Sequence, residues 1–194
     1  MITKFSDLDL NKSYTYGDYL LWQFEEKVEL IKGKIFKMSP APSRKHQDVA
    51  MNMTLAIGNF FREEPCKVYP ALFDVRFISE SEDIKKATTT LQPDLCIICD
   101  LDKLDKKGCV GAPDLVVEIL SKQNDVRDLK DKFEVYEEFG VREYWIVNPI
   151  NESVLIYVLN EFGKYIGLKP FVETEIQSTI FPQFSITTEE IFRE

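Results

Sequence analysis

The sequence predicts a mixed α/β fold of the α+β kind, in which helices flank a mixed central sheet. Three observations predict it. Residues 92–100 and 113–120 are nearly continuous apolar runs, as in strands that are buried on both faces. Residues 45–61 and 125–139 carry apolar side chains at helical spacing. The other strand-like segments do not alternate regularly with helices, so the order is not that of a doubly wound nucleotide-binding fold.

The length and composition fit one globular domain that spans residues 1–194. Of the 194 residues, 44% are apolar and 12% aromatic, enough to bury a sizeable core. No run of about 18 apolar residues occurs and the N-terminus lacks a signal-peptide pattern, so we expect a cytoplasmic protein without a membrane partner. No glycine-rich dinucleotide motif or P-loop occurs, which excludes those two nucleotide-binding functions.

The N-terminal part of the chain is expected to form a helix, a hairpin and a longer helix. The first helix is expected at 18–24. Residues 28–39 contain two short alternating runs around a Lys-Gly dipeptide, the pattern of a β-hairpin. Within 45–61, apolar side chains recur at 49, 50, 53, 56, 57 and 60, which is helical spacing. Ser43 stands where it can cap this helix.

The rest of the chain is expected to consist mainly of strands, with one further long helix. Strands are expected at 66–71, 72–78, 92–100, 113–120 and 143–149, and a hairpin at 153–159 and 163–169. The polar residues 79–90 are expected to form an exposed loop, and residues 101–110 a short helical or irregular segment. The long helix is expected at 125–139, and one last helical turn at 187–194.

The net charge of −9 limits the surfaces that this protein can offer to nucleic acid. The chain has 24 lysines and arginines against 33 aspartates and glutamates. This balance argues against a surface that grips nucleic acid indiscriminately, because such a surface needs a basic face. It leaves room for a basic cleft on an acidic body, and for an acidic site that binds divalent cations.

The four cysteines are expected to be small core residues. Their number in a chain of this length does not predict the disulfide framework of a secreted protein. Cys96 and Cys99 form a C-x-x-C pair, but a spacing of three within a strand points the two side chains to opposite faces. A redox pair, and a zinc site completed by His46, Cys66 and Cys109, are the alternatives.

A carboxylate stands inside the most apolar of the predicted strands. Glu118 lies within 113–120, and an ionised carboxylate in a dry interior costs several kcal/mol unless it is paired or binds a metal. Asp94 stands at the entrance of the strand 92–100, directly after a proline. If the two strands are neighbours, both carboxylates converge on one spot, and Mg²⁺ is typically held by one or two carboxylates. We expect nothing structural to require acids inside such apolar strands.

Three further polar residues are candidates for the same spot. Lys132 lies on the border of the apolar face of the helix 125–139, so it can point inward and stabilise charge on a phosphate. The alternatives are that Lys132 extends beside the core or pairs with a carboxylate. Glu29 stands at a position of the hairpin that can face inward, and His46 lies on the apolar side of the helix 45–61. For His46, a structural or capping role is the alternative.

At these residues the sequence resembles a restriction-endonuclease-like (Uma-type) domain family of bacteria, a branch of the PD-(D/E)XK nuclease superfamily. The resemblance covers about residues 14–190 and is carried by "VELIKGKIFKMSPAPSRKHQ", "VYPALFDVRF", "QPDLCIICD", "GAPDLVVEILSKQNDVRDLKDKFEVYEEFGVREYWIVNP" and the hairpin that follows. It implies a restriction-endonuclease-like fold, with a mixed central sheet flanked by helices. It also implies a metal-dependent endonuclease that hydrolyses phosphodiester bonds of DNA, with Mg²⁺ or Mn²⁺ as cofactor.

The resemblance implies roles for individual residues. Asp94 matches the aspartate of the PD motif and Glu118 the acidic member of (D/E)XK, so these two residues would hold the metal. Glu29 matches the acid of the family's N-terminal hairpin and His46 the histidine after its Ser-Pro loop, and both would support the site. The sequence departs from the superfamily at Leu120, where the motif has a lysine.

The missing lysine is expected to come from the helix that follows. Lys132 is the expected catalytic lysine, and Lys122 is the fallback. Arg44, Lys45, Lys122 and Arg127 are expected to line the mouth of the cleft and to contact phosphates of the nucleic acid. Nucleases of this fold are often dimers, and the apolar C-terminal hairpin is expected to support a homodimer.

Two other functions fit part of the sequence. The missing lysine and the net charge of −9 also fit a catalytically silent nuclease-like fold that binds nucleic acid or another protein. A metal hydrolase that acts on another substrate would need more histidines than the one in this chain, because zinc sites use histidine or cysteine.

Overall fold

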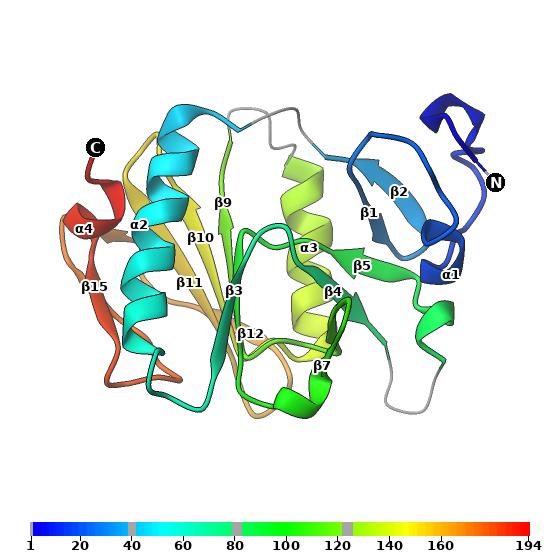
Figure 1. Ribbon diagram of the computed structural model, residues 1–194. Coiled ribbons are helices and arrows are strands. Elements are labelled where there is room, and N and C mark those ends of the chain that lie inside the picture. Colours follow the sequence, from blue (N-terminus) through cyan, green and yellow to red (C-terminus); the bar gives the residue numbers. More distant parts are fainter. Residues whose placement is uncertain (1, 39–41, 79–82, 122–125) are drawn as a thin grey trace.

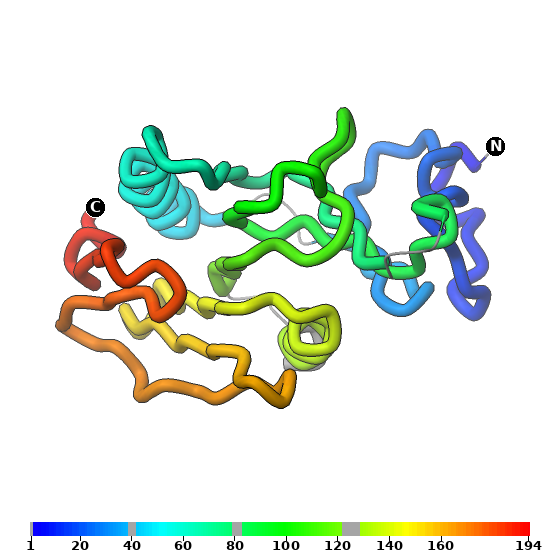
Figure 2. The backbone as a smooth tube through the Cα atoms, turned by 90° about the horizontal axis from the view of Figure 1, so that it is seen from below, coloured from blue at the N-terminus to red at the C-terminus, as the bar shows by residue number. Residues whose placement is uncertain are grey.

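Two long helices and a sheet between them form the centre of the molecule. The computed structural model describes residues 2–38, 42–78, 83–121 and 126–194, and for 126–128 it describes the backbone alone. The long helices are α2 (Arg44–Phe60) and α3 (Val126–Phe139) (Figure 1). Figure 2 shows the chain termini at opposite ends, with the N-terminal hairpin on one side of these helices and the C-terminal residues on the other.

The central sheet is mixed, as the irregular order of the elements predicts. Its strands lie in the order β12, β11, β10, β9, β6 and β3, and β13 pairs with β11. The bounds are β3 (Lys67–Pro70), β6 (Leu95–Ile98), β9 (Leu115–Ile119), β10 (Glu143–Asn148), β11 (Ser153–Leu159), β12 (Tyr165–Gly167) and β13 (Phe171–Val172). Only β9 and β10 run parallel among these strands of the described chain, and α3 makes the crossover that a parallel pair requires.

A second sheet carries the N-terminal hairpin. Its strands lie in the order β2, β1, β5, β4, β8 and β7. The bounds are β1 (Val28–Ile31), β2 (Lys34–Lys37), β4 (Asp74–Phe77), β5 (Thr89–Leu91), β7 (Leu104–Asp105) and β8 (Gly108–Val110). Residues 92–94 connect β5 to β6, so the chain crosses from the second sheet to the central sheet there. This crossing brings residues of both sheets to one place.

Short elements complete the fold at both ends of the chain. They are the 3₁₀ helices η1 (Phe5–Asp7), η2 (Ile84–Lys86) and η3 (Leu101–Lys103), the helices α1 (Tyr16–Tyr19) and α4 (Thr188–Phe192), and the strand pair β14 (Glu175–Gln177) and β15 (Ser185–Thr187). None of the helices within the described ranges is long and apolar enough to cross a membrane.

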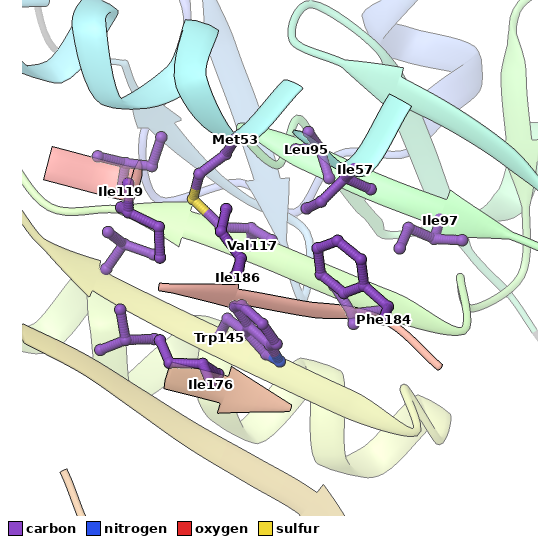
Figure 3. Packing of buried hydrophobic residues seen from close by; sticks show 14 of the residues in the cluster. Met53, Ile57, Leu95, Ile97, Val117, Ile119, Trp145, Ile176, Phe184 and Ile186 are labelled. Atoms are coloured by element: carbon purple, nitrogen blue, oxygen red, sulfur yellow. The ribbon is translucent and has the colours of Figure 1, made fainter. Parts of the chain in front are cut away.

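Two apolar cores lie on the two faces of the central sheet, because neighbouring side chains of a strand point to opposite faces. Val117 of β9 lies in the core with Met53 of α2 (Figure 3). Val116 lies in the other core with Tyr136 of α3. By the same alternation Glu118, two residues after Val116, points to the α3 face of the sheet.

The predicted helices and the N-terminal hairpin are largely confirmed. β1 and β2 form the hairpin expected at 28–39. Ser43 caps α2, because its side chain accepts a hydrogen bond from the backbone N–H of His46. The helix expected at 18–24 is wrong in position: α1 spans Tyr16–Tyr19, where a capping box starts it earlier.

Several short strands differ from the sequence prediction. The loop expected at 79–90 contains β5, and the segment 101–110 contains β7 and β8 after a single turn of 3₁₀ helix. The strands β13, β14 and β15 near the C-terminus were also not predicted. Each has only two or three residues, so an alternating pattern is too short to recognise, and pairing with a neighbour decides the structure.

A disulfide between Cys66 and Cys99 corrects the expectation that all cysteines are free core residues. The two residues lie opposite each other at the end of the antiparallel pair β3 and β6, a placement that depends on strand register and not on sequence spacing. Cys96 and Cys109 are buried free thiols, as expected. Cys96 and Cys99 lie in opposite cores, which confirms that they do not face each other.

Candidate active site

Three acidic side chains lie where the two sheets meet. Glu29 is on β1 of the second sheet, Glu118 is on β9 of the central sheet, and Asp94 is in the connection from β5 to β6 that joins them. The antiparallel register of β6 and β9, continued by one residue, places Asp94 opposite Glu118. The backbone N–H of Ile119 donates to Asp94 Oδ2 at 2.7 Å, so Asp94 contacts the strand that carries Glu118.

Lys132 of α3 lies between two of these carboxylates. Its Nζ atom is 3.1 and 3.2 Å from Oε1 and Oε2 of Glu118, and 3.2 Å from Oε2 of Glu29. The three residues are only 4–6% exposed. The structure shows the alternative in which Lys132 points inward and pairs with carboxylates, one from each sheet, and a catalytic role of Lys132 stays a prediction.

Tyr136 is a further member of this cluster, although helical spacing alone would count it only as part of the apolar face of α3. Its hydroxyl donates to Glu118 Oε1 at 2.6 Å. Tyr136 follows Lys132 by four residues, so one helical turn separates the two side chains that contact Glu118. That spacing is the signal from which the contact could have been expected.

Gln92 links the cluster to the second sheet and was also missed. Its backbone N–H donates to Glu29 Oε1 at 2.7 Å, and its side-chain amide donates to Asp74 Oδ1 at 2.7 Å. The side-chain oxygen of Gln92 is buried and has no hydrogen-bond partner among the described residues. The connection 92–94 therefore contributes Gln92 as well as Asp94 to the junction.

His46 lies on the other side of Asp94. Its Nε2 atom is 3.5 Å from Asp94 Oδ1, while Nδ1 is buried without a hydrogen-bond partner in the described part of the chain. Burial lowers the pKa of His46, but the hydrogen bond and the negative charge of Asp94 raise it, and the resulting pKa lies above the ordinary value. His46 thus lies in the first turn of α2, where its backbone N–H is capped by Ser43, and its side chain is a neighbour of the acidic cluster.

The cluster carries more negative than positive charge. With Asp94, Glu29 and Glu118 ionised and His46 neutral, Lys132 leaves two negative charges unbalanced. The pKa of Glu118 is raised to about 8, mainly by burial and also by the charges of Asp94 and Glu29, against the opposing effects of Lys132 and Tyr136. An additional cation would therefore stabilise the ionised form of Glu118.

The four basic residues expected at the mouth of the cleft are only partly described. Arg44 lies 3.5 Å from Glu194 and 3.8 Å from Asp48, and Lys45 lies 2.7 Å from Glu152. Arg44 and Lys45, which lie at the start of α2, are therefore both paired with acidic residues. Lys122 and the side chain of Arg127 lie outside the described residues. A role of these four residues in nucleic-acid binding stays a prediction.

A metal site built from three or more side chains is not found in the described residues. No group of three or more histidine, cysteine, aspartate or glutamate side chains there is close enough to hold a metal ion. The zinc site considered from the cysteines is not among them, since Cys66 and Cys99 form a disulfide. Asp94 and Glu118 are the carboxylates that face each other.

Comparisons with known proteins agree with this architecture. The family model of Uma2, described as "Putative restriction endonuclease", matches residues 16–189. A crystal structure from Anabaena variabilis ATCC 29413, described as "a putative nuclease belonging to DUF820", superposes with a TM-score of 0.71 at 17% sequence identity, and the match covers 92% of this chain and 97% of that one. No curated protein matches. The chain has the predicted restriction-endonuclease-like fold, and it belongs to the Uma2 family.

Proposed function

We propose that this protein is a metal-dependent endonuclease that hydrolyses phosphodiester bonds of DNA, and that Asp94 and Glu118 hold Mg²⁺ or Mn²⁺. The observation that carries the proposal is the group of three carboxylates and one lysine at the junction of the two sheets, in which Glu29, Glu118 and Lys132 are buried and Asp94 is partly exposed. Membership of the Uma2 family supports a nuclease activity of this kind. We add to this the identity of the metal, DNA as the substrate and the role of each residue.

The donor set fits a hard divalent cation. Mg²⁺ in proteins is usually held by one or two carboxylates, and its other positions are filled by water and substrate phosphate. Two unbalanced negative charges match the charge of one such ion. Oε2 of Glu118 contacts only Lys132 within the described ranges, so it keeps a lone pair for a metal. His46 is the one histidine of the chain, and zinc sites in proteins use several histidines or cysteines, so the site fits a hard cation better than zinc.

Each residue of the site has a separate role in the proposed hydrolysis. When bound, the divalent ion lowers the pKa of water and draws charge from the phosphate. Lys132, fixed by Glu29 and Glu118, orients the attacking water or stabilises the charge on the phosphate. The water oxygen adds to phosphorus, one backbone P–O bond breaks, and a proton passes to the leaving oxygen. His46 and Glu29 hold Asp94 and Lys132, respectively, in place.

The substrate and assembly follow from the same proposal. DNA would approach the acidic cluster along a local basic surface, because the protein as a whole carries a net charge of −9. The candidates for that surface are Arg44, Lys45, Lys122 and Arg127.

We also propose a homodimer through the C-terminal hairpin, because this hairpin has exposed apolar side chains, among them Ile166 at 55% exposure.

Asp114 gives a matched control for a test at Asp94. Each aspartate follows a proline at the entrance of one strand of the pair β6 and β9. Each also accepts a backbone N–H from the other strand, Asp94 from Ile119 at 2.7 Å and Asp114 from Cys99 at 2.8 Å. At the Asp114 end, however, the carboxylate pairs with the exposed Arg142 at 3.2 Å. The two sites share the backbone contact and differ in their surroundings.

The test compares native protein, Asp94→Asn and Asp114→Asn on supercoiled plasmid and on single-stranded DNA, with Mg²⁺ or Mn²⁺. We expect Asp94→Asn to lower the cleavage rate about 100-fold or more, since it removes one charged group from the reacting site. Asp114→Asn should stay within about 3-fold of native protein, because surface ion pairs contribute little. Equal activity of native protein and Asp94→Asn would contradict the proposed site.

A silent nuclease-like fold is the second candidate function, and Leu120 in place of the motif lysine favours it. If native protein neither cuts DNA nor binds Mn²⁺, a module that binds nucleic acid or another protein becomes the better interpretation. Mn²⁺ binding is measured directly by calorimetry, so the result does not depend on finding the right DNA.

A further inference from the structure

Tyr136 is a buried polar group to which the proposed mechanism gives no role. The residue is fully buried in α3, and its hydroxyl donates a hydrogen bond of 2.6 Å to Glu118 Oε1. Among the described residues of α3, this is the shortest contact to Glu118, since Lys132 Nζ lies at 3.1 and 3.2 Å from its two oxygens. A hydrogen bond of this length to a carboxylate is charge-assisted and fixes its geometry.

The two oxygen atoms of Glu118 are engaged unequally. Oε1 receives both the Tyr136 hydroxyl and the Lys132 ammonium group, which occupy its two lone-pair directions. Oε2 receives Lys132 alone within the described part of the chain. A cation that approaches Glu118 therefore finds an open position on Oε2 and not on Oε1.

The position of the Tyr136 hydroxyl is set by packing. The ring of Tyr136 meets Tyr144 edge to face at a centroid distance of 4.9 Å and lies 5.8 Å from the ring of Phe77. Side chains packed in this way hold one rotamer, so the hydroxyl is a fixed point and the more flexible Glu118 side chain adapts to it. Tyr136 therefore determines the orientation of the Glu118 carboxylate, and not the reverse.

We propose that Tyr136 is a positioning residue, which holds Glu118 in the orientation that presents Oε2 to the divalent metal. The inference rests on the proposed function, because it assigns Glu118 as a metal ligand. Partners of metal ligands typically contribute 10–100-fold to metal affinity, because they preset the ligand's orientation. If Tyr136 were only a structural core residue, its hydroxyl would affect stability and leave metal affinity unchanged.

Tyr165 supplies the matched control. Its hydroxyl donates to the backbone oxygen of Val141 at 2.9 Å, so Tyr165→Phe also removes one hydroxyl hydrogen bond from the same apolar core. The Tyr165 hydroxyl contacts Val141, and the Tyr165 ring packs against Phe133, Tyr144 and Tyr157. A general cost of losing a tyrosine hydroxyl will therefore appear in both variants.

The experiment measures Mn²⁺ binding without DNA, by calorimetry, for native protein, Tyr136→Phe and Tyr165→Phe. We expect Tyr136→Phe to weaken Mn²⁺ binding about 10-fold or more and Tyr165→Phe to bind within about 2-fold of native protein. In cleavage assays, Tyr136→Phe should need more metal for half-maximal rate and recover most of the native rate when metal is saturating. A merely structural role would not move the metal midpoint.

The outcomes separate this inference from the proposed function. If native protein binds Mn²⁺ and Tyr136→Phe binds it equally well, the positioning role is overturned and the nuclease proposal stands. If native protein does not bind Mn²⁺, the proposed function fails and this inference fails with it. Should Tyr136→Phe not fold, 4-aminophenylalanine at position 136 keeps a weaker donor in the same place. It should then weaken Mn²⁺ binding measurably, and native affinity would overturn the inference.

Discussion

Two glutamates on neighbouring strands of the central sheet are both buried but have different surroundings. Glu118 on β9 is 6% exposed and Glu143 on β10 is fully buried. Glu118 contacts a cation and a tyrosine, and lies near two other carboxylates. Glu143 contacts only neutral donors among the described residues: Trp145 Nε1 at 2.6 Å, Ser178 Oγ at 3.1 Å, Thr179 N at 3.0 Å and Ile180 N at 2.9 Å.

The difference shows what burial of an acid does and does not indicate. The expectation that nothing structural requires an acid inside an apolar strand is wrong for Glu143. Its carboxylate joins β10 to residues 178–180, far along the chain, by hydrogen bonds from neutral donors. What distinguishes Glu118 is the unbalanced charge around it, so the candidate site is recognised by its cluster and not by its burial.

The largest expected difference between the two glutamates is in DNA cleavage. We expect Glu118→Gln to lower the rate at saturating Mn²⁺ about 100-fold or more, because it removes a proposed metal ligand. Glu143→Gln should stay within about 3-fold of native protein if it remains folded. The measurement is plasmid nicking under single-turnover conditions, with circular dichroism as the folding control. Similar losses in both variants would remove the distinction that we draw from the clusters.

The strand and helix patterns of the sequence predict the orientation of several residues of this site. Alternation along residues 113–120 places Glu118 on the α3 face, and helical spacing places Lys132 at the border of the apolar face of α3, where it reaches that carboxylate. Glu29 is predicted to face inward from the hairpin, and it does so at 4% exposure. These predictions succeed because period and spacing are local properties of the chain.

The parts that the sequence does not predict depend on contacts between distant segments. Gln92 donates its backbone N–H to Glu29, a contact across 63 positions that no local pattern encodes. The disulfide between Cys66 and Cys99 depends on strand register in the same way. The hydroxyl of Tyr136 is hidden in the helix pattern because tyrosine counts there as an apolar residue.

A second prediction reverses the ranking of the two glutamates. Glu143→Gln should lower the free energy of unfolding by about 2 kcal/mol, because an amide cannot accept hydrogen bonds at both of its ends. Either the Trp145 N–H or the three donors of residues 178–180 would then face an NH₂ group. Near pH 5, Glu118→Gln should change this free energy by less than about 1 kcal/mol, because the Lys132 ammonium group keeps Glu29 as its partner. Urea denaturation measures both, and a larger loss for Glu118→Gln would contradict our account of Glu143.

The smallest expected effect is a pH dependence that belongs to Glu118. Its pKa in the folded protein is raised to about 8, mainly by burial, from an ordinary value of 4.5. The unfolded chain therefore releases this proton at lower pH than the folded chain, so stability falls as pH rises from about 5 to about 8. In the presence of EDTA, native protein should therefore lose stability relative to Glu118→Gln as pH rises. The loss in the free energy of unfolding should be about 1 kcal/mol or more across this range.

Excess metal tests whether this change of stability with pH comes from the charge of Glu118. If Asp94 and Glu118 hold a divalent ion, saturating Mg²⁺ should flatten the difference between native protein and Glu118→Gln, because bound cation favours the ionised carboxylate at every pH in the range. Urea denaturation at pH 5, 6.5 and 8, with EDTA or with Mg²⁺, gives both slopes. A slope that Mg²⁺ leaves unchanged would mean that burial and the neighbouring side chains, without a divalent ion, determine the charge of Glu118. The two glutamates would then both be structural, differing only in whether a cation or neutral donors surround them.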